Sequence, residues 1–334
     1  MELILWGFVF TVALLLVVKG ADWFLDSAEK IGLRIGLSSF VVGVVIVGLG
    51  TSLPELVSSF AALLQGTSEI VAANVVGSNI ANILLIIGLS AMVGGKLAVS
   101  KNLIDLDIPL LVMATTFGIM TMLDGVVTPV EALFLISAFI VFLLYSILNG
   151  GTSEDNIRQL FSFRPQHAKI EITNIGDDPK TEATENLTFR DFFWLVIGLG
   201  ALIFGGRYLV ESVVSVSEIL AVGVGAISLV AVAVGTSLPE LVVSIKAARQ
   251  GKHEVALGNI FGSNIFNILL VLGLPGLFMP LSVDAVTATI GIPFMIIATT
   301  FFVISGMSRR VHSYEGAIYV LVYAFFIGKL FGLF

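Results

Sequence analysis

The hexapeptide GTSLPE occurs at Gly50–Glu55 and again at Gly235–Glu240, each time inside a long apolar stretch. Each copy places a carboxylate, two hydroxyls and a helix-breaking proline at a depth where hydrocarbon disfavours all of them. A single copy could arise by chance in a chain this apolar. Two copies, 185 residues apart in a chain of 334 (Glu55 to Glu240), indicate a duplicated site.

The composition is that of an integral membrane protein. Charged residues make up 12% of the chain and apolar residues 57%, whereas soluble domains carry about 25% charged residues. The absence of cysteine excludes disulfides, thiolate zinc sites and cysteine nucleophiles. The three histidines lie among polar residues without metal-ligand spacing, and the net charge of −7 forms no run that would bind nucleic acid.

Ten stretches are apolar and long enough to cross a bilayer, which takes about 20 residues. These predicted spans cover approximately 3–20, 38–64, 69–93, 104–123, 126–148, 189–211, 223–249, 254–278, 284–305 and 312–333. The chain starts without the basic segment and cleavage site of a secretory signal, so the first stretch is read as a retained span. The polar segment 149–188 divides the spans into two sets of five, at 1–148 and 189–334.

The distribution of basic residues predicts the orientation of these spans. With the N-terminus outside, 15 of the 17 lysines and arginines fall in inner loops, and only Arg207 and Lys329 lie outside. Both termini are then outside, and the loop 149–188 is cytoplasmic, in a protein of the plasma (inner) membrane. Because five is odd, the two sets must run in opposite directions. The fold class predicted is therefore all-α, with two inverted five-helix repeats, an arrangement typical of secondary transporters.

The duplication extends well beyond the hexapeptide. At the same spacing, matching pairs include Glu69 and Glu254, Asn74 and Asn259, Gly77–Ile80 and Gly262–Ile265, and Asn82 and Asn267. Farther along, the spacing becomes 184, where Ala114–Phe117 matches Ala298–Phe301. The repeated motifs thus cover 48–82 in the first half and 233–267 in the second.

The repeated glutamates indicate a cation site. A carboxylate near the middle of a span costs several kcal/mol unless it is paired, hydrated or bound to a cation. The lysines and arginines fall in loops and at span ends, so Glu55 and Glu240 lack basic partners. The alternative is a pair of protonated glutamates that are hydrogen-bonded to the backbone.

The repeated prolines predict breaks in the second and seventh helices, just before the glutamates. Pro54 and Pro239 carry no N–H, so each should free carbonyls near Thr51 or Thr236. Such carbonyls are tolerated at membrane depth only inside protein or beside a wet cavity. Together with hydroxyl, amide and carboxylate oxygens, they are the ligands that Ca²⁺ takes, and Na⁺ accepts the same oxygens. A proline kink without a ligand is the alternative.

The second repeated motif supplies further oxygens. Ser78 and Asn82 are one helical turn apart and share a face, as do Ser263 and Asn267. They can complete a shell begun by the glutamates. The alternative role for these polar residues, Asn79 and Asn264 above all, is hydrogen bonding between helices. Gly77 and Gly262 are expected to allow close helix packing.

Taken together, GTSLPE followed by GSN and a further Asn, twice and inverted, resembles the α-repeats of the Na⁺/Ca²⁺ exchangers in the cation/Ca²⁺ exchanger superfamily, most closely the compact prokaryotic members. The resemblance implies that Glu55 and Glu240 are the central Ca²⁺ ligands, shared with Na⁺. It also implies a set of further ion-lining residues: Thr51, Thr236, Ser52, Ser237, Ser78, Ser263, Asn82, Asn267, and the carbonyls of Gly48 and Ala233.

Two positions depart from the family pattern. Asn267 stands where K⁺-dependent and some prokaryotic members have aspartate, so coupling to K⁺ is not expected. Gly48 stands where alanine is common, and a backbone carbonyl ligand would survive that difference.

The function predicted is Na⁺/Ca²⁺ antiport by alternating access, with Ca²⁺, Na⁺ and the lipid bilayer as partners and with no cofactor, nucleic acid or protein partner. A Ca²⁺/H⁺ antiporter of the same fold is the nearest alternative, and a cation channel is a weaker one. No nucleophile and base are paired in the spans, so an enzyme is not predicted. The acidic residues of 149–188 lack the Asp-x-Asp-x-Asp-Gly pattern, which favours a solvated connector over a regulatory Ca²⁺ site.

Overall fold

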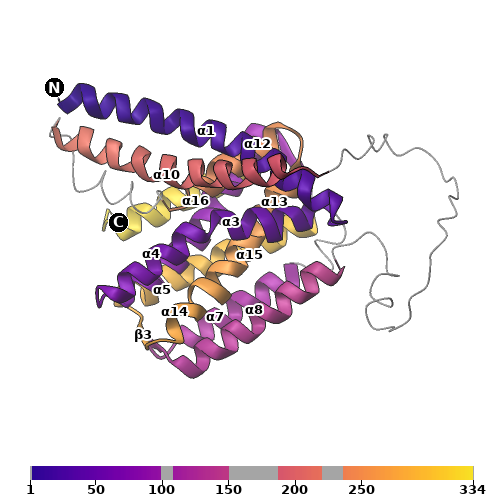
Figure 1. The fold of residues 1–334 in the computed structure, drawn as a ribbon. Coiled ribbons are helices and arrows are strands. Elements are labelled where there is room, and N and C mark those ends of the chain that lie inside the picture. The colour runs from indigo at the N-terminus through magenta and orange to yellow at the C-terminus, as the bar shows by residue number, and fades with distance from the viewer. Residues whose placement is uncertain (1, 99–107, 150–186, 220–235, 334) are drawn as a thin grey trace, which may run out of the picture.

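The computed structural model describes residues 2–98, 108–149, 187–219 and 236–333, and nearly all of them are helical. Figure 1 shows the N-terminus and the C-terminus at one end of the molecule. Helix α8 (Pro129–Asn149) ends, and α10 (Phe189–Ile219) begins, at the opposite end.

The first half of the chain also contains a series of further helical segments and two short strands. They are α1 (Glu2–Arg34), α2 (Ser39–Val41), η1 (Val42–Gly48), α3 (Leu49–Thr51), α4 (Leu53–Leu64), α5 (Glu69–Ile80), η2 (Ala81–Ile87), α6 (Gly88–Gly94), β1 (Lys96–Ala98), α7 (Ile108–Met122) and β2 (Val126–Val127). The second half continues with α12 (Leu238–Arg249), α13 (His253–Phe266), η4 (Asn267–Val271), α14 (Gly273–Gly276), β3 (Leu281–Ser282), η5 (Thr287–Gly291), α15 (Ile292–Met307), β4 (Arg310–His312) and α16 (Ser313–Leu330). The η segments are turns of wider π-helix within longer helices.

Among the described residues, seven helical segments are long and apolar enough to cross a membrane. They are Glu2–Arg34, Ser39–Leu64, Glu69–Gly94, Pro129–Leu148, Phe189–Leu209, His253–Gly276 and Thr287–Met307. The all-helical membrane class is therefore confirmed. The first part of the predicted seventh span, through Gly235, lies outside the described residues.

Helix α1 is longer than its predicted span, with 33 residues instead of a span over 3–20. Its apolar part ends near Val18, but the segment from Lys19 to Arg34 contains no proline and continues as helix. This polar extension carries Asp22, Asp26 and Glu29. Hydropathy alone locates the apolar part of a helix and not its end.

Helices α1 and α10 pack along each other as a close pair (Figure 1). Glycine makes this approach possible, since a Cβ atom on Gly20 would lie 2.9 Å from the carbonyl oxygen of Gly198. A Cβ atom on Gly205 would lie 3.1 Å from the carbonyl oxygen of Ala13. Small residues at such contacts let helix backbones approach each other within a membrane.

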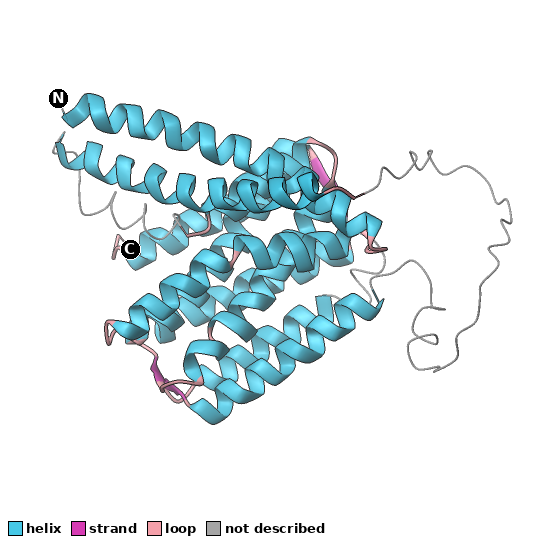
Figure 2. Cartoon of the chain, viewed as in Figure 1, coloured by secondary structure: helices cyan, strands magenta, loops and turns pink. Residues whose placement is uncertain are grey.

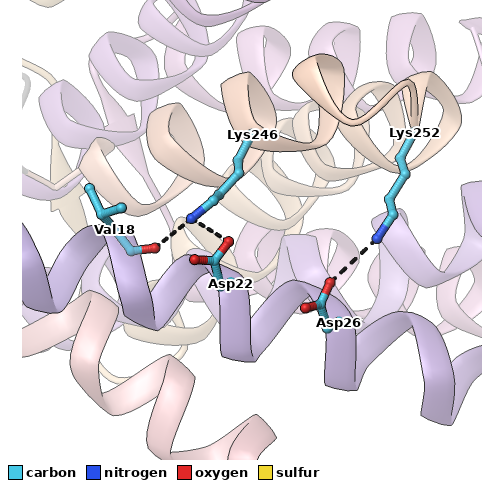
Figure 3. Close-up of polar contacts among 5 residues, drawn as sticks. All are labelled: Val18, Asp22, Asp26, Lys246 and Lys252. Atoms are coloured by element: carbon cyan, nitrogen blue, oxygen red, sulfur yellow. Dashed lines mark hydrogen bonds and ion pairs between the residues drawn. The ribbon is translucent and has the colours of Figure 1, made fainter.

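Ion pairs attach the polar extension of α1 to α12 and to the turn after it (Figure 3). Lys246 pairs with Asp22 and donates a hydrogen bond to the carbonyl oxygen of Val18 at 2.7 Å. Lys252 pairs with Asp26 at 3.4 Å and with Glu29 at 2.6 Å. These contacts connect two elements that belong to different halves of the chain.

Helix α13 forms the centre of the core and is buried almost along its whole length. It packs against η1, and the contact depends on glycines of α13. A Cβ atom on Gly262 would overlap the backbone of Val44, and one on Gly258 would overlap the carbonyl oxygen of Phe40. The segment that precedes the first GTSLPE therefore lies directly against the second repeat.

Two short antiparallel ribbons lie at opposite ends of the molecule (Figure 2). In the β1–β4 ribbon Leu97 is opposite Val311, and in the β2–β3 ribbon Val127 is opposite Leu281. At the spacing of 184 residues that aligns the later parts of the repeats, Leu97 is equivalent to Leu281 and Val127 is equivalent to Val311. The two ribbons thus use equivalent residues, and all four side chains are buried.

Candidate functional site

Both GTSLPE motifs begin a new helix. Helix α4 starts at Leu53 and α12 starts at Leu238, and each has its proline in the first turn, where a missing N–H does no harm. The preceding serines have similar backbone angles, with φ −84° and ψ 1° at Ser52 and φ −91° and ψ 10° at Ser237. The predicted break in the second helix is confirmed.

This local structure places Glu55 and Glu240 in the first turns of their helices, where the partial positive charge of the helix N-terminus favours a carboxylate. Their side chains are 1% and 0% exposed, and they lie close enough for their charges to interact. The hydroxyl of Ser52, from the first motif, donates to Oε1 of Glu240, from the second, at 3.4 Å. The two motifs therefore form one site.

Many of the buried polar atoms around these glutamates have no hydrogen-bond partner in the described part of the chain. These atoms are Oε1 and Oε2 of Glu55, Oε2 of Glu240, Oγ of Ser237, Oδ1 and Nδ2 of Asn82, and Oδ1 of Asn267. Buried polar atoms in proteins are almost always satisfied, so a cluster of exceptions requires a reason. Most of these atoms are oxygens, which are the atoms that bind Ca²⁺ and Na⁺.

A second group of oxygens gathers where the first motif meets α13. The hydroxyl of Thr51 lies 3.3 Å from the carbonyl oxygen of Gly48 and 3.4 Å from the hydroxyl of Ser263. Ser263 in turn donates to the carbonyl oxygen of Gly48 at 3.3 Å. The three predicted residues are thus brought together, and Glu240 lies beside Thr51 and Ser263.

The predicted residues of the other half are not arranged in the same way. Ser78 is buried but lines a cavity of about 230 Å³ that is also bounded by Asn74, Asp284, Thr287 and Tyr323. Thr236 is only partly buried, and Ala233 lies outside the described residues. The site is therefore asymmetric, although the two sequence motifs are alike.

Two asparagines outside the predicted set contact the site. Asn79 donates to the carbonyl oxygen of Asn264 at 3.2 Å and accepts from Nδ2 of Asn267 at 3.1 Å. The hydrogen bonding between helices that the sequence suggested for Asn79 is confirmed. Asn259 contacts Thr51 at 3.1 Å. Its position one turn before Ser263 was the available signal, because residues 259, 263 and 267 share a helix face.

Among the described residues, no group of three or more histidine, aspartate and glutamate side chains is placed to hold a metal ion. A cation at this site would instead be held by two carboxylates together with neutral oxygens. Such mixed oxygen shells suit hard cations and not the nitrogen-binding transition metals.

Comparison with known proteins matches this chain to the family described as "Sodium/calcium exchanger protein", over residues 5–148 and 191–331. The chain belongs to that family. Sodium/calcium exchanger MaX1 of Methanosarcina acetivorans is 34% identical over 96% of this chain and 97% of its own length. Inner membrane protein YrbG of Escherichia coli is 31% identical over 87% of this chain and 85% of its own length.

The sodium-calcium exchanger family is also represented among solved structures. A structure of the exchanger NCX_Mj superimposes with a TM-score of 0.80 at 27% identity and covers 98% of this chain and 99% of that one. MaX1 and NCX_Mj are named as sodium/calcium exchangers, which are transporters and not enzymes. This exchanger-family chain is accordingly a multi-pass membrane protein.

Proposed function

We propose that this chain is a secondary active antiporter that exchanges Na⁺ for Ca²⁺ by alternating access. The observation that carries the proposal is the shared site, in which Glu55 and Glu240 are both buried, carry unpartnered oxygens and are linked through Ser52 of the first motif. Family membership and the names of the relatives support the two ions.

In this proposal, Glu55 and Glu240 hold Ca²⁺ at the centre, assisted by Thr51, Thr236 and the asparagines Asn82 and Asn267. Na⁺ ions occupy the same carboxylates and extend to outlying oxygens. The outlying set consists of Gly48 and Ala233 through their carbonyls and of Ser52, Ser237, Ser78 and Ser263 through their hydroxyls. The contacts among Gly48, Thr51 and Ser263 support one of these outlying Na⁺ positions.

Competition for one set of oxygens couples the two fluxes. Two carboxylates neutralise one Ca²⁺, and several Na⁺ ions can replace it but cannot be bound together with it. Empty carboxylates are costly to move through a low-dielectric interior, so the site changes sides only when it is loaded. The scheme requires no cofactor.

The architecture that we propose has ten spans in two inverted five-helix repeats, 1–148 and 189–334, joined by a cytoplasmic loop at 149–188. The equivalent ribbons at opposite ends of the molecule support the inversion. The termini lie at the end of the molecule opposite to the end of α8 and the start of α10, which supports placing the termini and the loop 149–188 on opposite sides of the membrane. The name of the relative YrbG, an inner membrane protein, supports an inner (plasma) membrane location.

The test is Ca²⁺ uptake into vesicles that contain the purified protein. Vesicles loaded with Na⁺ should take up Ca²⁺, and vesicles loaded with K⁺, or carrying only a pH gradient, should not. Uptake that follows the proton gradient and ignores Na⁺ would establish a Ca²⁺/H⁺ antiporter and reject this proposal. Uptake that needs no counter-ion would indicate a channel.

A further inference from the structure

Asn259 lies at the point where the first motif meets α13, and it is not among the ion-lining residues of the proposed function. Its side chain is 0% exposed. It shares a helix face with Ser263 and Asn267, so it extends the row of ion-lining residues by one turn. Its repeat partner is Asn74, which aligns with it at the spacing of 185.

The orientation of the Asn259 amide follows from its partners. Nδ2 donates to the hydroxyl of Ser244 at 2.8 Å and lies 3.4 Å from the carbonyl oxygen of Glu240. Because a backbone carbonyl can only accept, the nitrogen must face Glu240. Oδ1 is therefore turned toward Thr51, whose hydroxyl donates to it at 3.1 Å.

The hydroxyl of Thr51 has one hydrogen and several acceptors within reach. The carbonyl oxygens of its own helix lie at 3.1 Å (Val47) and 3.3 Å (Gly48). If the hydrogen turned to Gly48, it would add a further donor to a carbonyl that already accepts from Ser52 N–H and from Ser263, and that the proposed function assigns to Na⁺. It would also leave buried Oδ1 of Asn259 without its donor, which costs free energy.

We propose that Asn259 is a positioning residue for the ion site, an inference that rests on the proposed function. Its Oδ1 takes the Thr51 hydrogen, which leaves the lone pairs of Thr51 available to a sodium ion and keeps a further hydroxyl hydrogen away from the carbonyl of Gly48. Its Nδ2 anchors this arrangement to Ser244 and to the backbone of Glu240. The ligand oxygens of both motifs are thereby held in one fixed geometry. In metal sites, loss of a residue that orients a ligand commonly lowers the metal affinity at least about tenfold.

The consequence is larger for Na⁺ than for Ca²⁺. Thr51 assists both ions, but the Gly48 carbonyl belongs to an outlying Na⁺ position, whereas Ca²⁺ is held mainly by the two carboxylates. Removing the Asn259 side-chain oxygen should therefore weaken Na⁺ binding more than Ca²⁺ binding. A residue that served only to pack α13 would weaken both ions together with the stability of the fold.

The experiment measures equilibrium binding of Na⁺ and of Ca²⁺ to the purified full chain in detergent by calorimetry. Asn259→Leu should weaken Na⁺ binding about tenfold and Ca²⁺ binding less than about threefold. Asn74→Leu is the matched control, because Asn74 contacts Ser58 and Ser59 at 3.4 Å, and its loss should change Na⁺ binding less than about threefold. Equal weakening by both variants, or equal weakening of both ions, would overturn the assignment.

A double-mutant cycle tests whether Asn259 acts through Thr51. In a Thr51→Val background, Asn259→Leu should have no further effect on Na⁺ binding, and additive losses would contradict the proposal. If Asn259→Leu does not fold, Ser244→Ala replaces it in the cycle, since it frees the amide to rotate without touching Thr51. Unmodified protein that binds no Na⁺ would instead reject the proposed function.

Discussion

At the scale of single residues, the charge of each central glutamate should be indispensable. Glu55→Gln or Glu240→Gln keeps the size of the side chain and removes half of the charge that neutralises Ca²⁺ in a buried site. The loss of several kcal/mol of interaction corresponds to a fall in Ca²⁺ flux of at least about a hundredfold. Flux into Na⁺-loaded vesicles measures it.

Glu131→Gln is the matched control for this prediction. Glu131 accepts from the backbone N–H of Thr128 at 2.8 Å at the start of α8, away from the site, and glutamine can still accept there. Its flux should stay within about twofold of the unmodified protein, because a surface cap contributes only about 1 kcal/mol to stability. Near-normal transport by either Glu55→Gln or Glu240→Gln would contradict the proposal that both carboxylates hold Ca²⁺.

Some site residues could be predicted from the sequence because they are repeated. Duplication singled out Glu55, Glu240, Thr51 and Ser263, since a costly buried group that occurs twice must have a use. The asymmetry between Ser263, which contacts the first motif, and Ser78, which lines a cavity, could not be predicted. Because the two motifs are identical in sequence, the sequence does not show around which of them the surrounding helices are closely packed.

At the scale of helices, the contact between α13 and η1 depends on glycine. Gly262→Ala would place a methyl group onto the backbone of Val44, which cannot move aside as a side chain can. Overpacking of this kind costs about 1–3 kcal/mol, so the midpoint of thermal unfolding in detergent should fall clearly. At the repeat partner Gly77, a methyl group would have no described atom within 4 Å, and Gly77→Ala should leave the midpoint nearly unchanged.

The ion pairs between α1 and α12 should contribute little to stability. Lys246 and Asp22 are both partly exposed, and such pairs are worth about 0–1 kcal/mol. Lys246→Met should therefore lower the unfolding free energy by less than about 1 kcal/mol, and high salt should reduce the difference. Asp22→Asn should give the same loss, and the double variant no more than either. A loss of about 3 kcal/mol or an absence of coupling would contradict this view of the contact.

The helices also show where prediction from sequence ends. The length of the apolar stretches predicted the spans because hydrocarbon thickness fixes the number of apolar residues, and seven described helical segments meet that criterion. The extension of α1 from Lys19 to Arg34 escaped that criterion, since charged residues interrupt its apolar ones and its buried side chains pack in contacts with α10 and α12. The wider π-helical turns, such as η1, likewise have no sequence pattern that the hydrophobic period would reveal.

At the scale of the whole molecule, the proposed inverted repeat accounts for the different packing of two similar halves. In the second half, Asn259 and Ser263 are buried against Thr51. In the first half, Asn74 contacts its own repeat and lines the cavity beside Ser78. In the proposed carrier, the two ends of the site open in turn, so at any moment one half must be closed where its partner is open.

The proposed inversion predicts that two equivalent residues face opposite sides of the membrane. Gln65 and Gln250 align in the repeats, and both are exposed beside glycines with the same left-handed backbone, φ 76° at Gly66 and φ 75° at Gly251. The chain has no cysteine, so Gln65→Cys and Gln250→Cys each introduce a single thiol. In intact cells, a membrane-impermeant maleimide should label Gln65→Cys, since the proposed topology places that turn outside. Gln250→Cys should react only after the membrane is opened. Labelling of both from the same side would exclude inverted repeats, because parallel repeats alone place equivalent turns on one side of the membrane.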